Sequence, residues 1–270
     1  MARPSRAVIG PAPADLGAES VTYPSGSGSN IHAWLTRGVL GGGSVLLLHG
    51  VGANRTSMLE RARFLHRLGF TVLAPDFQAN GESPGDHVTF GARESLDAAA
   101  SMTFLRGAMP AERVGVIGIS MGGAAALLGP GPLDANAFVL ESVYPTIRQA
   151  VSDRLSTWLG PLGGVARLFT PAVIHFVGDD IGIKEIELRP IDQIARLHAP
   201  LLFLAGTADP YTPIAEAESL YARAPFPKAY WPVQGAGHED LYAYDKIEYE
   251  RRVGGFLFRA LRASMTEREQ

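Results

Sequence analysis

Serine, histidine and aspartate are the side chains of this sequence that could together cleave an acyl bond. A serine hydroxyl is a weak nucleophile, so it needs a histidine base that an acid holds in place. A reactive serine is often presented in the pattern Gly-x-Ser-x-Gly, at a sharp turn between a strand and a helix. The pattern occurs twice, as GESPG at 81–85 and as GISMG at 118–122. Because the chain has 31 glycines, the pattern can arise by chance, and its context must distinguish the two copies.

The context of the second copy fits an active serine. The apolar stretch RVGVIGI at 113–119 predicts a buried strand, and the small residues after Ser120 predict a helix. In acyl transfer, the backbone N–H of the residue after the nucleophile stabilises the oxyanion. Met121 follows Ser120 and has this N–H, whereas Pro84 follows Ser83 and has none. We therefore predict that Ser120 is the nucleophile and that GESPG is a turn.

His238 is the predicted base. A serine in a strand–turn–helix elbow is expected to be followed in the chain by its acid and then by its histidine. His238 lies in the glycine-rich stretch VQGAGHEDLY, directly after the last predicted strand, from where it could reach the carboxyl edge of a sheet. His198 precedes a predicted strand and would lie at the opposite edge, and His175 lies in a long insertion.

Asp209 and Glu141 are two candidates for the acid. Asp209 follows the apolar stretch PLLFLAG at 200–206, and parallel sheets place their sites at the carboxyl ends of their strands. Glu141 ends the apolar stretch AFVLE and is the alternative acid. Asp240, two residues after His238, is expected to be solvated. We predict Asp209 as the acid and keep Glu141 as the alternative.

A second oxyanion donor is expected from the loop after the first long strand. That loop reads HGVGANR at 49–55. A tight turn at its first glycine would direct the N–H of Val51 toward the serine, so Val51 and Met121 are the predicted oxyanion donors. Asn54 and Arg55 are candidates to brace this loop.

The same loop also resembles part of a dinucleotide-binding fingerprint. GVGANR follows a predicted strand and opens a predicted helix, and Asp76 ends the next strand, where such a fold places the acid that binds the ribose. However, Arg55 stands where the third glycine is needed. We therefore disfavour a nucleotide site and expect Asp76 to tie a turn together.

The elements that would position these residues alternate between short apolar runs and longer helical patterns. Most of the apolar runs are continuous, which is typical of strands buried on both faces. Strand–helix alternation predicts a mainly parallel sheet with helices on both of its faces. An antiparallel hairpin is predicted near the N-terminus, in VTYPSGSGSNIHAWLTRG. The predicted strands are residues 44–49, 71–75, 113–119, 137–141, 200–206 and 229–233.

Helices are predicted at 57–69 and at about 91–107, where apolar residues recur at helical spacing. Residues 143–192 separate two predicted strands by far more than one helix needs, and they begin with an amphipathic stripe from Ile147 to Leu159. No linker-like composition flanks this segment, so we expect an insertion over one edge of the sheet rather than a second domain. Five aromatic residues could line an apolar pocket or pack in the core: Trp158, Phe169, Phe176, Tyr211 and Trp231.

Composition excludes several classes of protein. The chain has 270 residues, 46% of them hydrophobic, which is enough for a sizeable core. Its formal charge of −3 and the absence of a basic block disfavour nucleic-acid binding. No apolar run approaches the roughly 18 residues of a membrane span. With no cysteine, the chain has neither disulfides nor thiolate metal sites.

The ends of the chain differ in composition from the rest. The Pro, Ala and Gly content of residues 1–18 predicts a flexible arm, and residues 263–270 form a polar tail. The intervening residues, 19–262, are predicted to form one domain. The N-terminus lacks the apolar core of a signal peptide, which favours the cytoplasm, although removal of a targeting segment before residue 1 would leave the same sequence.

Five motifs in this order and spacing resemble the α/β-hydrolase family: HGVGANR, DFQANGES, GISMGG, GTADP and GAGHE. The resemblance runs from about residue 20 to 262, and it is similar to the BEM46-like branch of single-domain serine hydrolases. It implies an eight-stranded, mostly parallel sheet with a triad of Ser120, Asp209 and His238. It also implies an oxyanion hole at Val51 and Met121, and a cap formed by the 143–192 insertion.

The resemblance also implies an activity. We expect a serine carboxylesterase that cleaves small to medium acyl esters through an acyl-enzyme, with no metal or organic cofactor. A thioesterase, an amidase or an acyltransferase would use the same groups and is the alternative within enzymes. A non-catalytic binding protein on the same scaffold is the alternative of a different class. A haloalkane dehalogenase or an epoxide hydrolase of this fold would be expected to have Asp at position 120, where this chain has Ser120.

Overall fold

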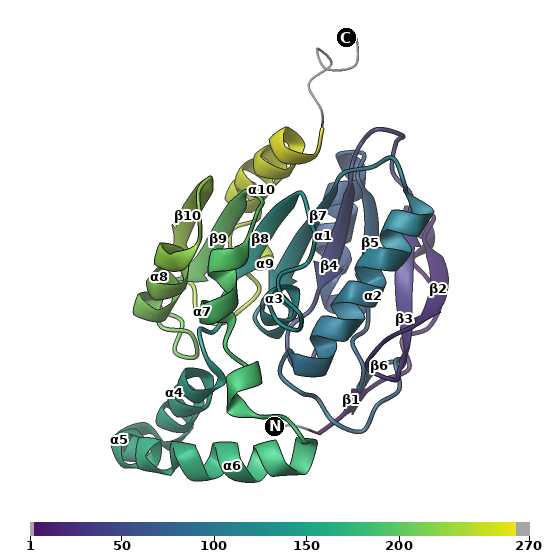
Figure 1. Cartoon of the computed structure of the whole chain (residues 1–270). Coiled ribbons are helices and arrows are strands. Elements are labelled where there is room, and N and C mark those ends of the chain that lie inside the picture. The colour runs from purple at the N-terminus through teal and green to yellow at the C-terminus, as the bar shows by residue number, and fades with distance from the viewer. Residues whose placement is uncertain (1–2, 263–270) are drawn as a thin grey trace.

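The computed structural model describes residues 3–262, except for the side chains of residues 161 and 166. Its central element within that range is an eight-stranded sheet (Figure 1). The strands are β2 (Glu19–Pro24), β3 (Asn30–Thr36), β4 (Ser44–Leu48), β5 (Thr71–Pro75), β7 (Val114–Ile119), β8 (Ala137–Glu141), β9 (Leu201–Gly206) and β10 (Lys228–Val233). Their spatial order is β10-β9-β8-β7-β4-β5-β3-β2. All six predicted apolar strands are confirmed, each to within one residue at either end.

The direction of the strands places their carboxyl ends together. The six strands from β5 to β10 in the spatial order run parallel to one another. Strand β3 is antiparallel to β5, and β2 is antiparallel to β3, which confirms the predicted N-terminal hairpin. Loops that follow β4, β7, β9 and β10 therefore meet at one edge of the sheet, and these loops contain the predicted site residues.

Continuous apolar strands are required because helices cover both faces of the sheet. In β4, Leu46 and Leu48 pack into the core on one face, whereas Val45 and Leu47 pack into the core on the other. Successive side chains of a strand point to opposite faces, so every position of such a strand has to be apolar. Figure 1 shows α2, α3 and α8 in front of the sheet and α1 behind it.

The helices of the described residues fall into two groups, those that cover the sheet and those of the insertion between β8 and β9. The first group comprises α1 (Leu59–Arg67), α2 (Ala92–Ala108), α3 (Met121–Leu127), α8 (Ile214–Arg223), α9 (Leu241–Tyr244) and α10 (Lys246–Leu261). The insertion contains α4 (Ile147–Leu159), α5 (Gly163–Ala166), α6 (Thr170–Ile181) and α7 (Pro190–Gln193), joined by 3₁₀ turns. The predicted helices at 57–69 and 91–107 correspond to α1 and α2.

The insertion lies at one edge of the sheet. In Figure 1, α4, α5 and α6 lie together below the sheet, and the chain returns through α7 to β9. Helix α4 begins with an N-cap, because the Thr146 hydroxyl accepts from the backbone N–H of Gln149. Large apolar side chains of these helices are exposed: Trp158, Leu159, Leu162, Val165, Leu168, Phe169 and Phe176.

Part of the predicted flexible arm is paired with the domain. Ser5–Arg6 (β1) forms a parallel two-residue pairing with Asn80–Gly81 (β6), and Leu16 is buried in the core. The predicted polar tail, 263–270, lies outside the described residues. No helix in the described part of the chain has the length and apolar character needed to cross a membrane.

Candidate active site

Ser120 lies in a sharp turn between β7 and α3, as the strand–turn–helix reading predicts. Its backbone has φ +49° and ψ −112°, a conformation that a non-glycine residue adopts only under strain. The flanking glycines make this turn possible. A Cβ atom on Gly122 would lie 2.2 Å from the carbonyl oxygen of Leu48, and one on Gly118 would lie 2.7 Å from the Cα of Gly123. The turn thus holds the serine at the carboxyl edge of the sheet.

Asp209 lies in the loop after β9 and is held by four hydrogen bonds. Its Oδ1 accepts from the backbone N–H groups of Tyr211 (2.8 Å) and Thr212 (2.9 Å). Its Oδ2 accepts from the Thr212 hydroxyl (2.6 Å) and faces Nδ1 of His238. Burial opposes ionisation of this carboxyl, but the hydrogen bonds and charge of His238 and the hydrogen bonds of Thr212 outweigh it. The pKa of Asp209 therefore lies below its ordinary value.

His238 and Asp209 are brought together across two loops. The distance from His238 Nδ1 to Asp209 Oδ2 is 2.7 Å. The carboxylate thereby fixes the imidazole ring with its other nitrogen, Nε2, free for a second partner. The ring of Tyr211 packs edge-on against the imidazole, with 5.6 Å between the centroids.

Ser120 and His238 face the same hollow. Both residues line an open cavity of about 380 Å³. Within residues 3–262, the hydrogen bond that would join the Ser120 hydroxyl to His238 is not formed. Contacts of this kind are often long in ligand-free structures and shorten when a substrate is bound.

Glu141, the alternative acid, lies in a different network. It is buried and forms an ion pair with Arg61 (2.8 Å), and it accepts a hydrogen bond from the hydroxyl of Tyr249. Arg61 also pairs with Asp240, 2.7 Å away, and the side chain of Asp240 is exposed, as expected. The described structure thus joins His238 to Asp209 and joins Glu141 to Arg61.

The loop after β4 lies beside Ser120 and is held in place by hydrogen bonds of His49. The N–H of Val51 has no hydrogen-bond acceptor among the described residues, and the N–H of Met121, first in α3, has none within its helix. Buried His49 fixes the loop, because its Nδ1 contacts the carbonyl of Gly50 (2.8 Å) and its Nε2 accepts from the N–H of Phe77 (3.1 Å). Burial lowers the pKa of His49, which keeps this ring neutral. The sequence analysis did not identify this role of His49.

Arg55 and Asp76 brace the other end of the loop. Asp76 accepts from the backbone N–H of Arg55 (2.7 Å) and pairs with its buried guanidinium, which also pairs with Glu82. The guanidinium lies over the ring of Trp34, 4.8 Å from its centroid. Asp76 also accepts from the N–H of Glu82 (2.9 Å). Asp76 therefore ties a turn together, as expected, and Asn54 caps the first turn after the loop by accepting from a backbone N–H.

Ser83, the serine of the other Gly-x-Ser-x-Gly copy, is a buried structural residue. Its hydroxyl donates to the carbonyl of Asp76 (2.8 Å) and accepts from the N–H of His32 (2.9 Å). This stretch begins at Gly81, the last residue of the two-residue strand β6, and continues as a turn, as predicted. With both hydrogen-bonding functions of its hydroxyl engaged, Ser83 links the hairpin to the turn that braces the oxyanion loop.

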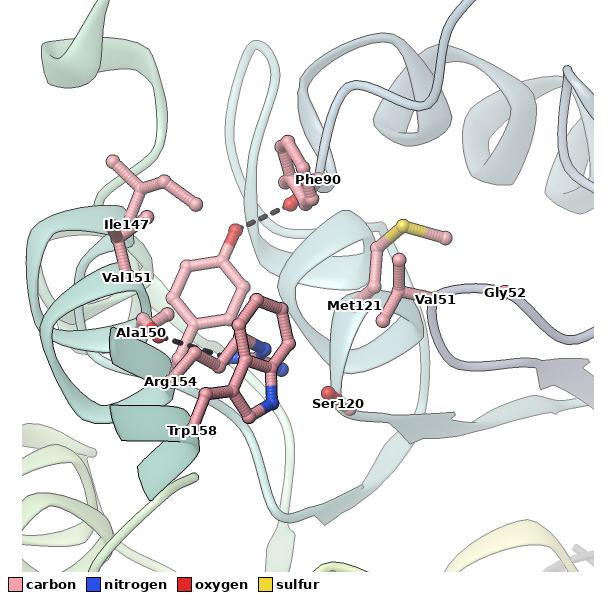
Figure 2. A pocket seen from close by; sticks show the side chains of 11 residues that line it. Val51, Gly52, Phe90, Ser120, Met121, Ile147, Ala150, Val151, Arg154 and Trp158 are labelled. Atoms are coloured by element: carbon pink, nitrogen blue, oxygen red, sulfur yellow. Dashed lines mark hydrogen bonds between the residues drawn. The ribbon is translucent and has the colours of Figure 1, made fainter. Parts of the chain in front are cut away.

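A second, mainly apolar cavity adjoins Ser120. Figure 2 shows the side chains around it, and its volume is about 310 Å³. A hydrogen bond from the Tyr144 hydroxyl to the carbonyl of Phe90 closes one wall. The lining residues are Val51, Gly52, Phe90, Ser120, Met121, Tyr144, Ile147, Ala150, Val151, Arg154 and Trp158.

The five aromatic pocket candidates have different locations. Trp158 lines both cavities, and Tyr211 lines the one shared with His238. Trp231 is buried in the core. Phe169 and Phe176 are exposed on the insertion. The positions of Arg154, Tyr144 and the first-turn residues of α4 in the pocket were not predicted, because the sequence carries no signal for where α4 docks.

No group of three or more histidine, aspartate and glutamate side chains within residues 3–262 is arranged to hold a metal ion. The site described above consists of a serine, an acid–histidine pair and free backbone N–H groups around two hollows. Such a set of groups supplies a nucleophile, a base with its acid, and oxyanion donors, which are the groups that nucleophilic acyl transfer uses.

Comparison with known proteins places the chain in a family. The sequence profile of the Alpha/beta hydrolase family matches residues 45–246, and the chain belongs to this family. It is similar to the uncharacterized protein YqkD of Bacillus subtilis, with 26% identity over 79% of this chain and 70% of that protein. It is also similar to the alpha/beta hydrolase domain-containing protein WAV2 of Arabidopsis thaliana, with 26% identity over 80% of this chain and 70% of that protein.

Solved structures show the same fold. The esterase Pf2001 of Pyrococcus furiosus matches with a TM-score of 0.77 and 25% identity, over 97% of this chain and 98% of that one. The predicted α/β-hydrolase fold is thereby confirmed, and esterases are among its structural neighbours. Membership of the BEM46-like branch stays a prediction.

Proposed function

We propose that this protein is a serine hydrolase, and that it is a carboxylesterase for small to medium acyl esters. The observation that carries the proposal is the 2.7 Å contact between Asp209 and His238, beside a hollow that His238 shares with Ser120. The strained elbow at Ser120 and the esterase neighbour of the same fold support it.

In the first half of the proposed reaction, the Ser120 hydroxyl attacks the ester carbonyl. His238 takes the hydroxyl proton at Nε2, while Asp209 holds Nδ1 and stabilises the imidazolium. The N–H groups of Val51 and Met121 donate to the oxyanion of the tetrahedral intermediate. His238 then returns the proton to the alcohol, which leaves from the cavity of about 380 Å³ that His238 lines.

In the second half, water attacks the acyl-enzyme with His238 again as the base, and the acid product is released. The acyl group of the intermediate would occupy the apolar cavity beside Ser120. Its volume of about 310 Å³ is at the lower end of the range of about 300–1,000 Å³ for small-molecule sites. This size suits short and medium acyl chains better than long ones.

Hydrolysis of p-nitrophenyl esters from acetate to palmitate, by wild type and Ser120→Ala, tests the proposal. We expect the wild type to hydrolyse the shorter esters, and the variant to lose about 10⁴-fold or more in kcat. Wild-type protein that is folded but inert on every ester would contradict ester cleavage, and thioesters, amides and a binding role would then be tested. The proposed cytoplasmic location is tested separately, by fractionation of cells.

A further inference from the structure

Arg154 brings a positive charge into the proposed active site. It lies on α4 of the insertion, and it lines both the apolar cavity and the hollow that contains His238. In the view of Figure 2, its guanidinium lies behind the ring of Trp158. An arginine in an otherwise apolar pocket points to a specific ligand group, because burying an uncompensated charge is costly.

This guanidinium has no carboxylate partner. Within residues 3–262, no aspartate or glutamate oxygen lies within 4.0 Å of it. Its one hydrogen bond to the described part of the chain runs from Nη1 to the carbonyl of Ala150, 3.1 Å away on the same helix. A guanidinium has five N–H donors, so most of its donors remain available. The guanidinium also lies over the ring of Tyr211, 5.2 Å from its centroid.

Three other arginines of this protein are paired with carboxylates. Arg148, six residues earlier on α4, is exposed and forms a bidentate ion pair with Glu185, at 2.7 and 2.6 Å. Arg55 and Arg61 are buried and each pairs with two carboxylates. Arg154 differs from these three in lying half-buried at the active site without such a pair.

The charge of Arg154 is only partly balanced from a distance. Burial lowers the pKa of Arg154, and the negative charge of Asp209 acts against this effect without contact. The side chain stays protonated, since an arginine does not lose its proton under ordinary conditions. A planar carboxylate would satisfy the free edge of the guanidinium with two parallel hydrogen bonds, which are stronger in a pocket than in water.

We propose that Arg154 binds a carboxylate of the substrate, so that the preferred substrates are esters with a carboxylate a few atoms from the scissile bond. This inference rests on the proposed hydrolase function and deepens it. The base must protonate the leaving alcohol, so the hollow lined by His238 takes the alcohol side and the apolar cavity takes the acyl side. Because Arg154 lines both cavities, the carboxylate can belong to the acyl part or to the alcohol part of the substrate, within a few atoms of the ester bond.

Pairs of esters that match in shape and differ in charge test the inference. On the acyl side, monoethyl glutarate is compared with ethyl 5-methylhexanoate, in which an isopropyl group replaces the carboxylate. On the alcohol side, the acetate ester of 4-hydroxybutanoate is compared with 4-methylpentyl acetate. The products are separated and quantified by chromatography, and kcat/KM is obtained for each ester with wild type, Arg154→Gln, Arg154→Lys and Arg148→Gln.

We expect the charged-to-neutral ratio of kcat/KM to fall by about 10- to 100-fold in Arg154→Gln, in at least one of the two pairs. Arg154→Lys should recover part of the ratio, because it restores the charge without the planar fork. Arg148→Gln should leave it unchanged. A merely structural role for Arg154, such as support of the Tyr211 loop, would lower both members of a pair equally.

Two failures are distinguishable. If Ser120-dependent hydrolysis of the neutral esters remains and the ratio is unchanged in Arg154→Gln, the inference is wrong and the proposed function stands. If no ester is cleaved and Ser120 does not react with a fluorophosphonate, both are wrong.

A measurement on the wild type covers the case in which the Arg154 variants do not fold. Glutarate should inhibit hydrolysis of the neutral ester about 10-fold or more tightly than 1,5-pentanediol. Equal inhibition by the two compounds would overturn the inference.

Discussion

Substitution of Asp209 tests its proposed role as the acid that orients His238. In Asp209→Asn, the amide oxygen should remain at the Oδ1 position, where it accepts from the backbone N–H groups of Tyr211 and Thr212. The amide NH₂ then faces His238 Nδ1, where the carboxylate oxygen now lies at 2.7 Å. An NH₂ group donates, so Nδ1 would have to accept, and the neutral ring would have its proton on Nε2. The base could then no longer accept a proton from Ser120.

A loss of the correct tautomer lowers kcat by about 10⁴-fold in enzymes with an established Ser-His-Asp triad. We expect a fall of about 10³- to 10⁴-fold here, which corresponds to about 4–5.5 kcal/mol of the activation barrier. The assay is hydrolysis of p-nitrophenyl acetate, at a temperature where circular dichroism shows that both proteins are folded.

Glu141→Gln is the matched control, because Glu141 is the other acid at the end of a strand. It removes a charge from the buried pair with Arg61, so we expect a loss of about 3 kcal/mol in the free energy of unfolding. Arg61 keeps its contact with Asp240, which limits the loss. Activity of the folded variant should stay within a few-fold of wild type. The reasoning is refuted if Asp209→Asn retains activity, or if folded Glu141→Gln loses it.

Two further predictions concern stability. Gly122→Ala should destabilise the fold by about 3 kcal/mol or more, because its Cβ would lie 2.2 Å from a backbone carbonyl of β4. Gly107→Ala, at a helical position of α2 with no atom within 4 Å of the new Cβ, should stabilise by about 0.5–1 kcal/mol, and urea unfolding compares the two. If the two substitutions changed the free energy of unfolding equally, the close contact of Gly122 with β4 would be contradicted. Burial and the charge of Asp153 raise the pKa of Glu216 to about 8, so the folded state holds this proton more tightly than the unfolded state does. The contribution of Glu216 to the free energy of unfolding is fully present below pH 4.5 and is lost as the pH rises through 8. Glu216→Gln should therefore stabilise by about 1–2 kcal/mol at pH 8.5, after allowance for solvent screening, and have little effect at pH 4.5, as measured by the melting temperature. A variant with the same effect at both pH values would contradict the raised pKa.

Much of the scaffold could be predicted because its signals are local. Each central strand is a short, continuous apolar run, since both of its faces are covered, and the glycines around Ser120 are required by contacts of 2.2 and 2.7 Å that a side chain would make. The absence of an N–H at Pro84 separated the two serine motifs without any structural information.

The features that could not be predicted depend on contacts between distant parts of the chain. Glu141 stayed an open alternative because its partner Arg61 lies 80 residues earlier and is not part of any motif. Arg154 is one of two arginines on an amphipathic helix, a pattern that is typical of a solvated surface, and only the docking of α4 brings it to the pocket. The pairing of β1 with β6 joins two residues to two others 75 positions away, which no periodicity reveals.

The central claim is that Ser120, and not Ser83, is the nucleophile. Reaction with a fluorophosphonate probe, followed by intact-protein mass spectrometry and peptide mapping, tests it most directly on wild type, Ser120→Ala and Ser83→Ala. We predict one adduct, at Ser120, in the wild type and in the folded fraction of Ser83→Ala, and none in Ser120→Ala. An adduct at the same rate on Ser120→Ala, or no adduct on folded wild-type protein, would contradict the account.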